Sequence, residues 1–194
     1  LQLAELVADF ERRTASKAST SFSDTCANGG TADVVLTDPD QNRKPTAGDS
    51  LRVTLRNCYA SAIDDTATGE FTVTLEAPAA GANEAYVGTA TFTSGFLVGV
   101  AGAAERIEIN GSLRADWRSE ALQTITRVAG SAQDDLQFVV STTTARVIER
   151  LRSPQLSKTL RYDLARALTR MNFSYESQAL RGQVTFSTPE DLSS

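Results

Sequence analysis

Apolar and polar residues alternate with a period of two along most of this chain, and this pattern constrains its fold more than any other feature. In residues 71–76, for example, Phe71, Val73 and Leu75 alternate with threonine and glutamate. Successive side chains of a β-strand point to opposite faces of a sheet, so such a run predicts a strand with one apolar face. Roughly ten to twelve runs of strand length follow one another, which predicts a mostly β fold. We expect an antiparallel meander that forms a large curved sheet, a sandwich or a barrel.

Residues 105–118 contain Asn110-Gly111, a dipeptide that is typical of a two-residue hairpin turn. However, Ile107, Ile109 and Leu113 keep one unbroken period across it. A tight turn there would move the two isoleucines to the polar face. We therefore predict one long strand with Gly111 on its inner face, where a bend or a close neighbour removes the need for a side chain.

The first residues follow a helical pattern instead. Leu3, Leu6, Val7 and Phe10 recur at the spacing of a short amphipathic helix. Small polar residues follow, so we expect a helix and linker over residues 1–23 and a single β domain over residues 24–194. The chain begins at Leu1, as a mature or trimmed product would, and the lack of a signal peptide is therefore uninformative. No apolar run is long enough to cross a bilayer as a helix.

The two cysteines, Cys26 and Cys58, bracket a predicted hairpin. Strand-like runs over residues 31–37 and 50–57 flank a polar loop, and the sequence midpoint of the two cysteines, position 42, falls inside that loop. A hairpin that turns there places the cysteines opposite each other, within the roughly 4.4–6.8 Å between Cα atoms that a disulfide requires. We predict a disulfide in an exported protein. The alternative is two free buried cysteines in a cytosolic protein.

The loop over residues 38–49 resembles a calcium-binding loop. Asp38, Asp40 and Asn42 occupy its first, third and fifth positions, and Asp49 occupies the twelfth. Calcium binds roughly six to eight oxygen atoms, which alternating acidic side chains on a tight loop supply. Arg43 stands where a glycine usually makes the sharp turn. We therefore predict a weak calcium site at these four residues, with an ordinary polar hairpin loop as the alternative.

Four short motifs follow one another around the cysteines: Cys26-x-x-Gly29-Gly30, Asp38-x-Asp40-x-Asn42, Gly48-Asp49-Ser50 and Asn57-Cys58. In this order they resemble a pattern in uncharacterised exported proteins and lipoproteins of Gram-negative bacteria. The resemblance implies a disulfide, a β-meander and a location in the periplasm, at the outer membrane or on the cell surface. It implies no activity.

Catalytic chemistry finds little support in this composition. The chain has no histidine, which removes the commonest general base and metal ligand. Glu108 and Asp116 share the polar face of one predicted strand, but nothing selects them as the carboxylate pair of a glycosidase. A serine nucleophile would lack both its base and a Gly-x-Ser-x-Gly motif. We predict a protein that is not an enzyme and has no catalytic residues.

The charge distribution bears on partners. A net charge of −5 gives no global reason to expect nucleic-acid binding. In the second half, however, a run of basic residues is interrupted by only two acidic residues, Glu149 and Asp163. It comprises Arg146, Arg150, Arg152, Lys158, Arg161, Arg166 and Arg170. This cluster predicts either solvated strand faces or a site for an acidic partner.

Two functions remain from these observations. The first is a structural or protein-binding component of the cell envelope, a subunit of a larger assembly, because the chain stops soon after its last long strand and an open sheet edge pairs readily in trans. The alternative is a periplasmic carrier that holds a hydrophobic ligand, such as a lipid, in a curved sheet. Its aromatic lining would be Phe92, Phe96, Trp117, Phe138, Phe173 and Tyr175.

Overall fold

The computed structural model describes residues 21–26, 29–42, 46–59, 66–77, 84–99, 105–120, 123–129, 136–161, 166–188 and 192–193. These residues form a single sheet of 12 strands. In chain order the strands are β1 (Ser21–Thr25), β2 (Thr31–Thr37), β3 (Ser50–Tyr59), β4 (Thr66–Ala77), β5 (Glu84–Gly99), β6 (Arg106–Glu120), β7 (Gln123–Ala129), β8 (Leu136–Ser141), β9 (Arg146–Arg161), β10 (Arg166–Ser177), β11 (Gly182–Ser187) and β12 (Leu192–Ser193).

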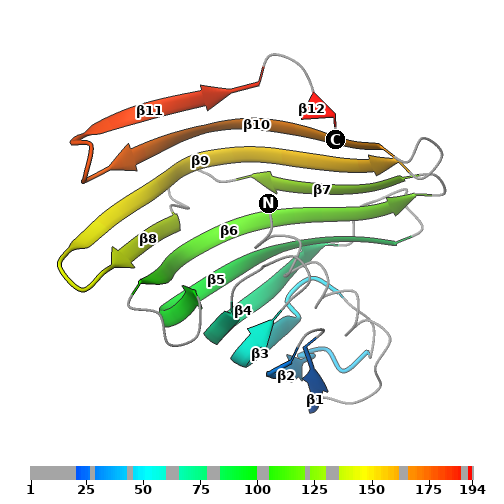
Figure 1. Ribbon diagram of the computed structural model, residues 1–194. Coiled ribbons are helices and arrows are strands. Elements are labelled where there is room, and N and C mark those ends of the chain that lie inside the picture. Colours follow the sequence, from blue (N-terminus) through cyan, green and yellow to red (C-terminus); the bar gives the residue numbers. More distant parts are fainter. Residues whose placement is uncertain are drawn as a thin grey trace.

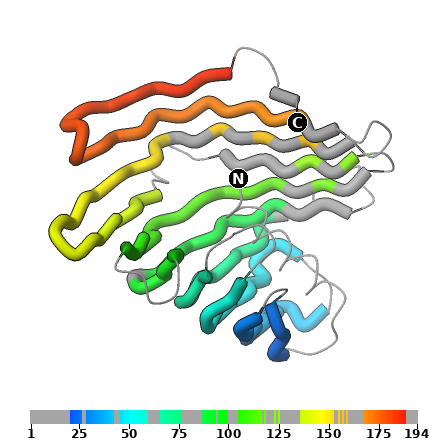
Figure 2. The backbone as a smooth tube through the Cα atoms, in the orientation of Figure 1, coloured from blue at the N-terminus to red at the C-terminus, as the bar shows by residue number. Residues whose placement is uncertain are grey.

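The strands follow one another across the sheet as a meander (Figure 1). Every pairing is antiparallel. This confirms the predicted mostly β, antiparallel meander and gives it the form of one sheet, which twists and curves along its length (Figure 2). The predicted N-terminal helix lies outside the described residues. Its predicted linker reached residue 23, whereas β1 begins at Ser21.

The centre of the meander departs from a simple succession. β7 and β8 lie between β6 and β9, each pairing with a different part of both long strands. β6 is one continuous strand, as predicted from its period. Gly111 lies within β6, paired with Phe92 on one side and Leu136 on the other. Its φ of 105° is a conformation that glycine adopts without steric cost.

The proline within residues 153–157 predicts a loop there, and this prediction is wrong because β9 continues through these residues. The register explains why a proline is tolerated there. β8 pairs with β9 up to Leu151, and β7 resumes the pairing at Gln155. Pro154 thus lies where neither strand pairs and where the register with β10 also shifts, so its missing N–H costs no ladder hydrogen bond.

The apolar residues of β2 to β6, together with Leu136 of β8, form the core on one face of the sheet, which we call the inner face. Phe71, Phe92 and Phe96 lie at its centre, with ring centroids 5.0–5.8 Å apart. Gly69 leaves room for them, because a Cβ at this position would lie 2.6 Å from the Cα of Phe96. The buried cluster comprises Ala32, Val34, Leu51, Val53, Leu55, Cys58, Ala67, Phe71, Val73, Ala90, Phe92, Phe96, Ile109, Leu113, Ala115 and Leu136.

Candidate metal centre

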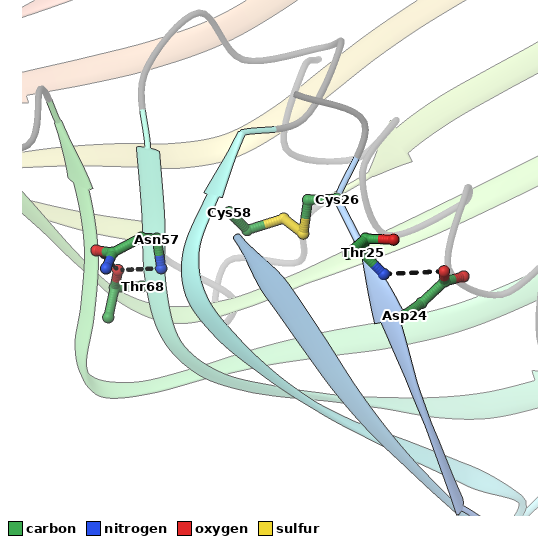
Figure 3. The surroundings of a disulfide bond; sticks show 6 residues. All are labelled: Asp24, Thr25, Cys26, Asn57, Cys58 and Thr68. Atoms are coloured by element: carbon green, nitrogen blue, oxygen red, sulfur yellow. Dashed lines mark hydrogen bonds between the residues drawn. A yellow bond between two sulfur atoms is a disulfide. The ribbon is translucent and has the colours of Figure 1, made fainter. Parts of the chain in front are cut away.

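The predicted disulfide is confirmed. Cys26, just after β1, is bonded to Cys58 of β3, and their Cα atoms are 5.5 Å apart (Figure 3). Cys58 is buried in the core and Cys26 packs against it. The bond therefore joins the edge of the sheet to the third strand at the open end of the β2–β3 hairpin.

A β-bulge in β3 turns Cys58 toward Cys26. The register between β3 and β4 shifts between Leu55 and Cys58, and Asn57 takes a positive φ of 49° there, which asparagine tolerates better than most residues. The backbone N–H of Asn57 donates to Thr68 Oγ1 at 3.0 Å (Figure 3). Gly30 packs so closely that a Cβ would lie 2.0 Å from the carbonyl oxygen of Asn57. The bulge therefore moves Cys58 to the same face as Leu55.

The acidic loop lies at the opposite end of the same hairpin. Asp38 follows the last residue of β2, and Asp49 precedes the first residue of β3. The backbone N–H of Gly48 donates to the Leu75 carbonyl at 2.9 Å, and the N–H of Leu75 donates to the Asp49 carbonyl at 2.8 Å. These two bonds fasten the loop to the end of β4 and fix the position of the Asp49 backbone.

Three carboxylates converge in this loop. One carboxylate oxygen each from Asp38, Asp40 and Asp49 lies within 4.8 Å of the others. Asp49 is only 1% exposed. Its Oδ2 accepts a hydrogen bond from the backbone N–H of Thr46 at 2.7 Å, whereas its Oδ1 is buried and accepts none from the described residues. A buried carboxylate oxygen without a donor is costly, and neighbouring like charges add to that cost.

Asn42, the fourth predicted ligand, lies beside these carboxylates. Its Nδ2 donates to Asp40 Oδ2 at 2.6 Å and to Thr46 Oγ1 at 3.1 Å, so the side chain orients Asp40. Thr46, which the sequence reasoning missed, contacts both Asp40 and Asp49. The one feature of the sequence that points to Thr46 is its position three residues before Asp49, a spacing that is common in turns.

The arrangement offers hard oxygen donors, the type that calcium and magnesium prefer. The three carboxylates supply one to two oxygen atoms each, so water or backbone carbonyls would complete a calcium coordination shell. The flexible geometry that calcium accepts fits an irregular hairpin loop better than the strict octahedron that magnesium demands.

The two carboxylates of β6 that the sequence placed on one face have separate partners. Glu108 Oε1 accepts a hydrogen bond from the backbone N–H of Gly95 at 3.2 Å. Asp116 binds Arg118 through both carboxylate oxygens, at 3.0 and 3.1 Å. Both contacts are of the kind that orders polar strand faces.

Comparison of the chain with protein-family models, curated proteins and solved structures found no match. The resemblance of its cysteine and aspartate motifs to exported Gram-negative proteins therefore stays a prediction. Among the described residues, no helix has the length and apolar character needed to span a membrane.

Proposed function

We propose that this protein is a non-enzymatic, exported component of a bacterial cell envelope that binds another protein chain through the free edge of its sheet. The observation that carries the proposal is the exposed apolar surface at β11. Val184 and Phe186 of this strand are 41% and 47% exposed, and Leu180 in the preceding turn is 71% exposed. They are the large hydrophobic side chains that lie exposed in the described part of the chain.

The position of β11 favours strand addition. β11 pairs with β10 on one side, and no described strand pairs with its other side, so the strand forms an edge of the sheet (Figure 1). Phe186 stacks on Phe173 of β10 with ring centroids 4.9 Å apart. An added strand would satisfy the edge backbone groups and cover this apolar layer.

The alternative function, a carrier for a hydrophobic ligand, has weaker support. Phe92 and Phe96, two of the aromatic residues considered for a ligand pocket, are 3% and 0% exposed. They contact each other and Phe71 in tilted and edge-on arrangements. Such packing is typical of a filled core.

In this proposal a calcium ion at Asp38, Asp40 and Asp49 joins the two ends of the β2–β3 loop, which the backbone hydrogen bonds to Leu75 fasten to β4. The ion would neutralise the converging carboxylates and supply the missing partner of Asp49 Oδ1. At about 10 mM calcium, a site with the affinity of extracellular modules would stabilise the fold by about 1–3 kcal/mol.

Thermal unfolding in calcium and in chelator tests the metal. Calcium should raise the Tm of the wild type and leave that of Asp49→Asn unchanged. The loop sequence also holds Arg43 and Lys44, so the double variant Arg43→Ala/Lys44→Ala separates a metal ion from an internal cation. A calcium response that persists in this variant supports the metal, whereas a wild type indifferent to calcium contradicts it.

Native mass tests the edge. We expect the protein from its own source to run as a species larger than its 20.8 kDa chain. The variant Val184→Lys/Phe186→Lys should release the single chain, while Thr91→Lys, an exposed position on the central strand β5, should not. A wild type that runs at the mass of one chain in both calcium and chelator would contradict the assembly role and favour the carrier.

A further inference from the structure

The chemistry of the partner follows from the other face of the same sheet edge, and this inference rests on the proposed function. A hollow of about 780 Å³ lies where β9, β10 and the turn before β11 meet. The lining side chains that matter here are Arg150, Arg152, Glu176, Arg181 and Gln183. The hollow thus adjoins β11 on the outer face of the sheet, opposite to the face that carries the exposed Phe186.

The hollow carries an excess of positive charge. Three arginines lie in its wall together with one acidic side chain, Glu176. Glu176 Oε2 is 2.7 Å from Arg152 Nη2, so this pair is neutralised. Within the described part of the chain, no ion pair is formed by Arg150 or Arg181. Two guanidinium groups are therefore available for an anionic ligand, and arginine binds carboxylates in a well-defined, often bidentate geometry.

Hydrogen bonds to two buried side chains, Ser177 and Glu149, hold the turn that carries Arg181. The backbone N–H of Leu180 donates to Ser177 Oγ at 3.1 Å, and Ser177 Oγ donates to Glu149 Oε1 at 2.9 Å. Glu149 is 7% exposed. Burial, together with the adjacent Glu149 carboxylate, raises the pKa of Tyr175. These buried contacts hold the turn in place, which lowers the entropy cost of binding at Arg181.

The strand register links the hollow to the apolar side of the edge. Gln183 pairs with Glu176, which pairs with Arg150, and these side chains share the outer face. Val184 and Phe186 belong to the alternate set and lie on the inner face. Successive residues of a strand added beside β11 would meet these two surfaces in turn.

We propose that the partner is an extended segment in which apolar and acidic side chains alternate. Its apolar set covers Val184 and Phe186, and its acidic set faces the hollow, where Arg181 lies next to β11 and Arg150 adds positive charge further in. β1, the other edge strand, does not fit this description, because its outer positions are Ser21, Ser23 and Thr25. A second copy of this chain that pairs through β1 is therefore not the expected partner.

Fluorescence anisotropy with synthetic peptides tests the inference. The probe is a labelled strand of alternating valine and aspartate, with one backbone edge N-methylated so that it cannot pair with itself. The matched probe carries asparagine in place of aspartate. We expect the acidic peptide to bind at least about tenfold more tightly, with a preference that falls as salt rises.

Two variants test whether the arginines of the hollow cause the preference for the acidic peptide. Arg150→Ala/Arg181→Ala should abolish the preference for the acidic peptide, while Arg52→Ala on β3, an exposed arginine far from the edge, should retain it. Circular dichroism of each variant checks that the fold is intact.

Three results would overturn the inference, and they separate it from the proposed function. If both peptides bind equally and Val184→Lys/Phe186→Lys abolishes both, the edge binds protein but does not select acidic side chains. If heparin or polyphosphate binds through the same arginines and neither peptide does, the hollow is a polyanion site. If neither peptide nor polyanion binds, the inference fails, and native mass decides independently whether the edge forms an assembly.

Discussion

Removal of the Cys26–Cys58 disulfide should lower the free energy of unfolding by about 3–4 kcal/mol at 25 °C. The bond closes a loop of 32 residues, which contains β2, the acidic loop and most of β3. In the chain-entropy description, opening a loop of this length restores that much conformational freedom to the unfolded chain. The loss is a large part of the roughly 5–15 kcal/mol by which most domains are stable.

Urea unfolding measures this effect. The oxidised protein is compared with protein that has been unfolded and refolded in reductant, and the variant Cys26→Ala/Cys58→Ala serves as the control that reductant must leave unchanged. The oxidised chain should also have the smaller m-value, because a cross-linked unfolded state exposes less surface. A stability difference below about 1 kcal/mol would refute the reasoning, since it would mean that the unfolded chain is already restricted without the bond.

Three further predictions concern the same sheet. Gly30→Ala should destabilise the fold by more than the roughly 1–3 kcal/mol that a positive φ costs a non-glycine residue, because its Cβ would also collide with the Asn57 carbonyl. Gly48→Ala should cost only that backbone strain, because nothing lies within 4 Å of its Cβ. Equal losses of stability in urea unfolding would contradict this. Phe71→Ala should lower stability by about 3–5 kcal/mol, and Phe186→Ala, at a half-exposed edge position, should lower it far less; a similar cost at both sites would count against the assigned core. Hydrogen bonds from the Ser23 hydroxyl and, second, the Arg56 guanidinium hold the pKa of Asp33 below its ordinary 3.8. The ionised Asp33 carboxylate therefore stabilises the fold above pH 3.8, and this contribution is lost as the pH falls through the pKa of Asp33 in the folded protein. The difference in stability between the wild type and Asp33→Asn should close on acidification, and a difference that stays constant from pH 7 to pH 2 would contradict this.

The sequence predicted the features that depend on local pattern. A period of two predicts strands and their apolar faces, and it correctly kept β6 whole through Asn110-Gly111 because the inner positions on both sides of that dipeptide stay in phase. The disulfide was predictable because a hairpin with its turn near position 42 leaves few other places for two cysteines 32 residues apart.

Features that depend on distant neighbours were not predictable. Pro154 argues for a loop when it is considered alone, and only the gap between β7 and β8 explains its place within β9. β1 was missed because Ser21–Thr25 is short and polar, and its pairing with β2 and the nearby disulfide hold it in the sheet. The three aspartates were identified from loop spacing, but the burial of Asp49 depends on its contact with Leu75 of β4. The hollow at Arg150 and Arg181 requires the fold, since those residues meet only through the turn between β10 and β11.

Hydrogen exchange of the β11 amides, measured in the protein as isolated from its source and again in the Val184→Lys/Phe186→Lys variant, tests the edge proposal most directly. The outward-facing amides of residues 182–187, which do not bond to β10, should be protected in the native species and exchange rapidly in the variant, with β5 equally protected in both. Rapid exchange of β11 in the native species would contradict the proposal, because a strand paired on both sides protects its outward-facing amides as well.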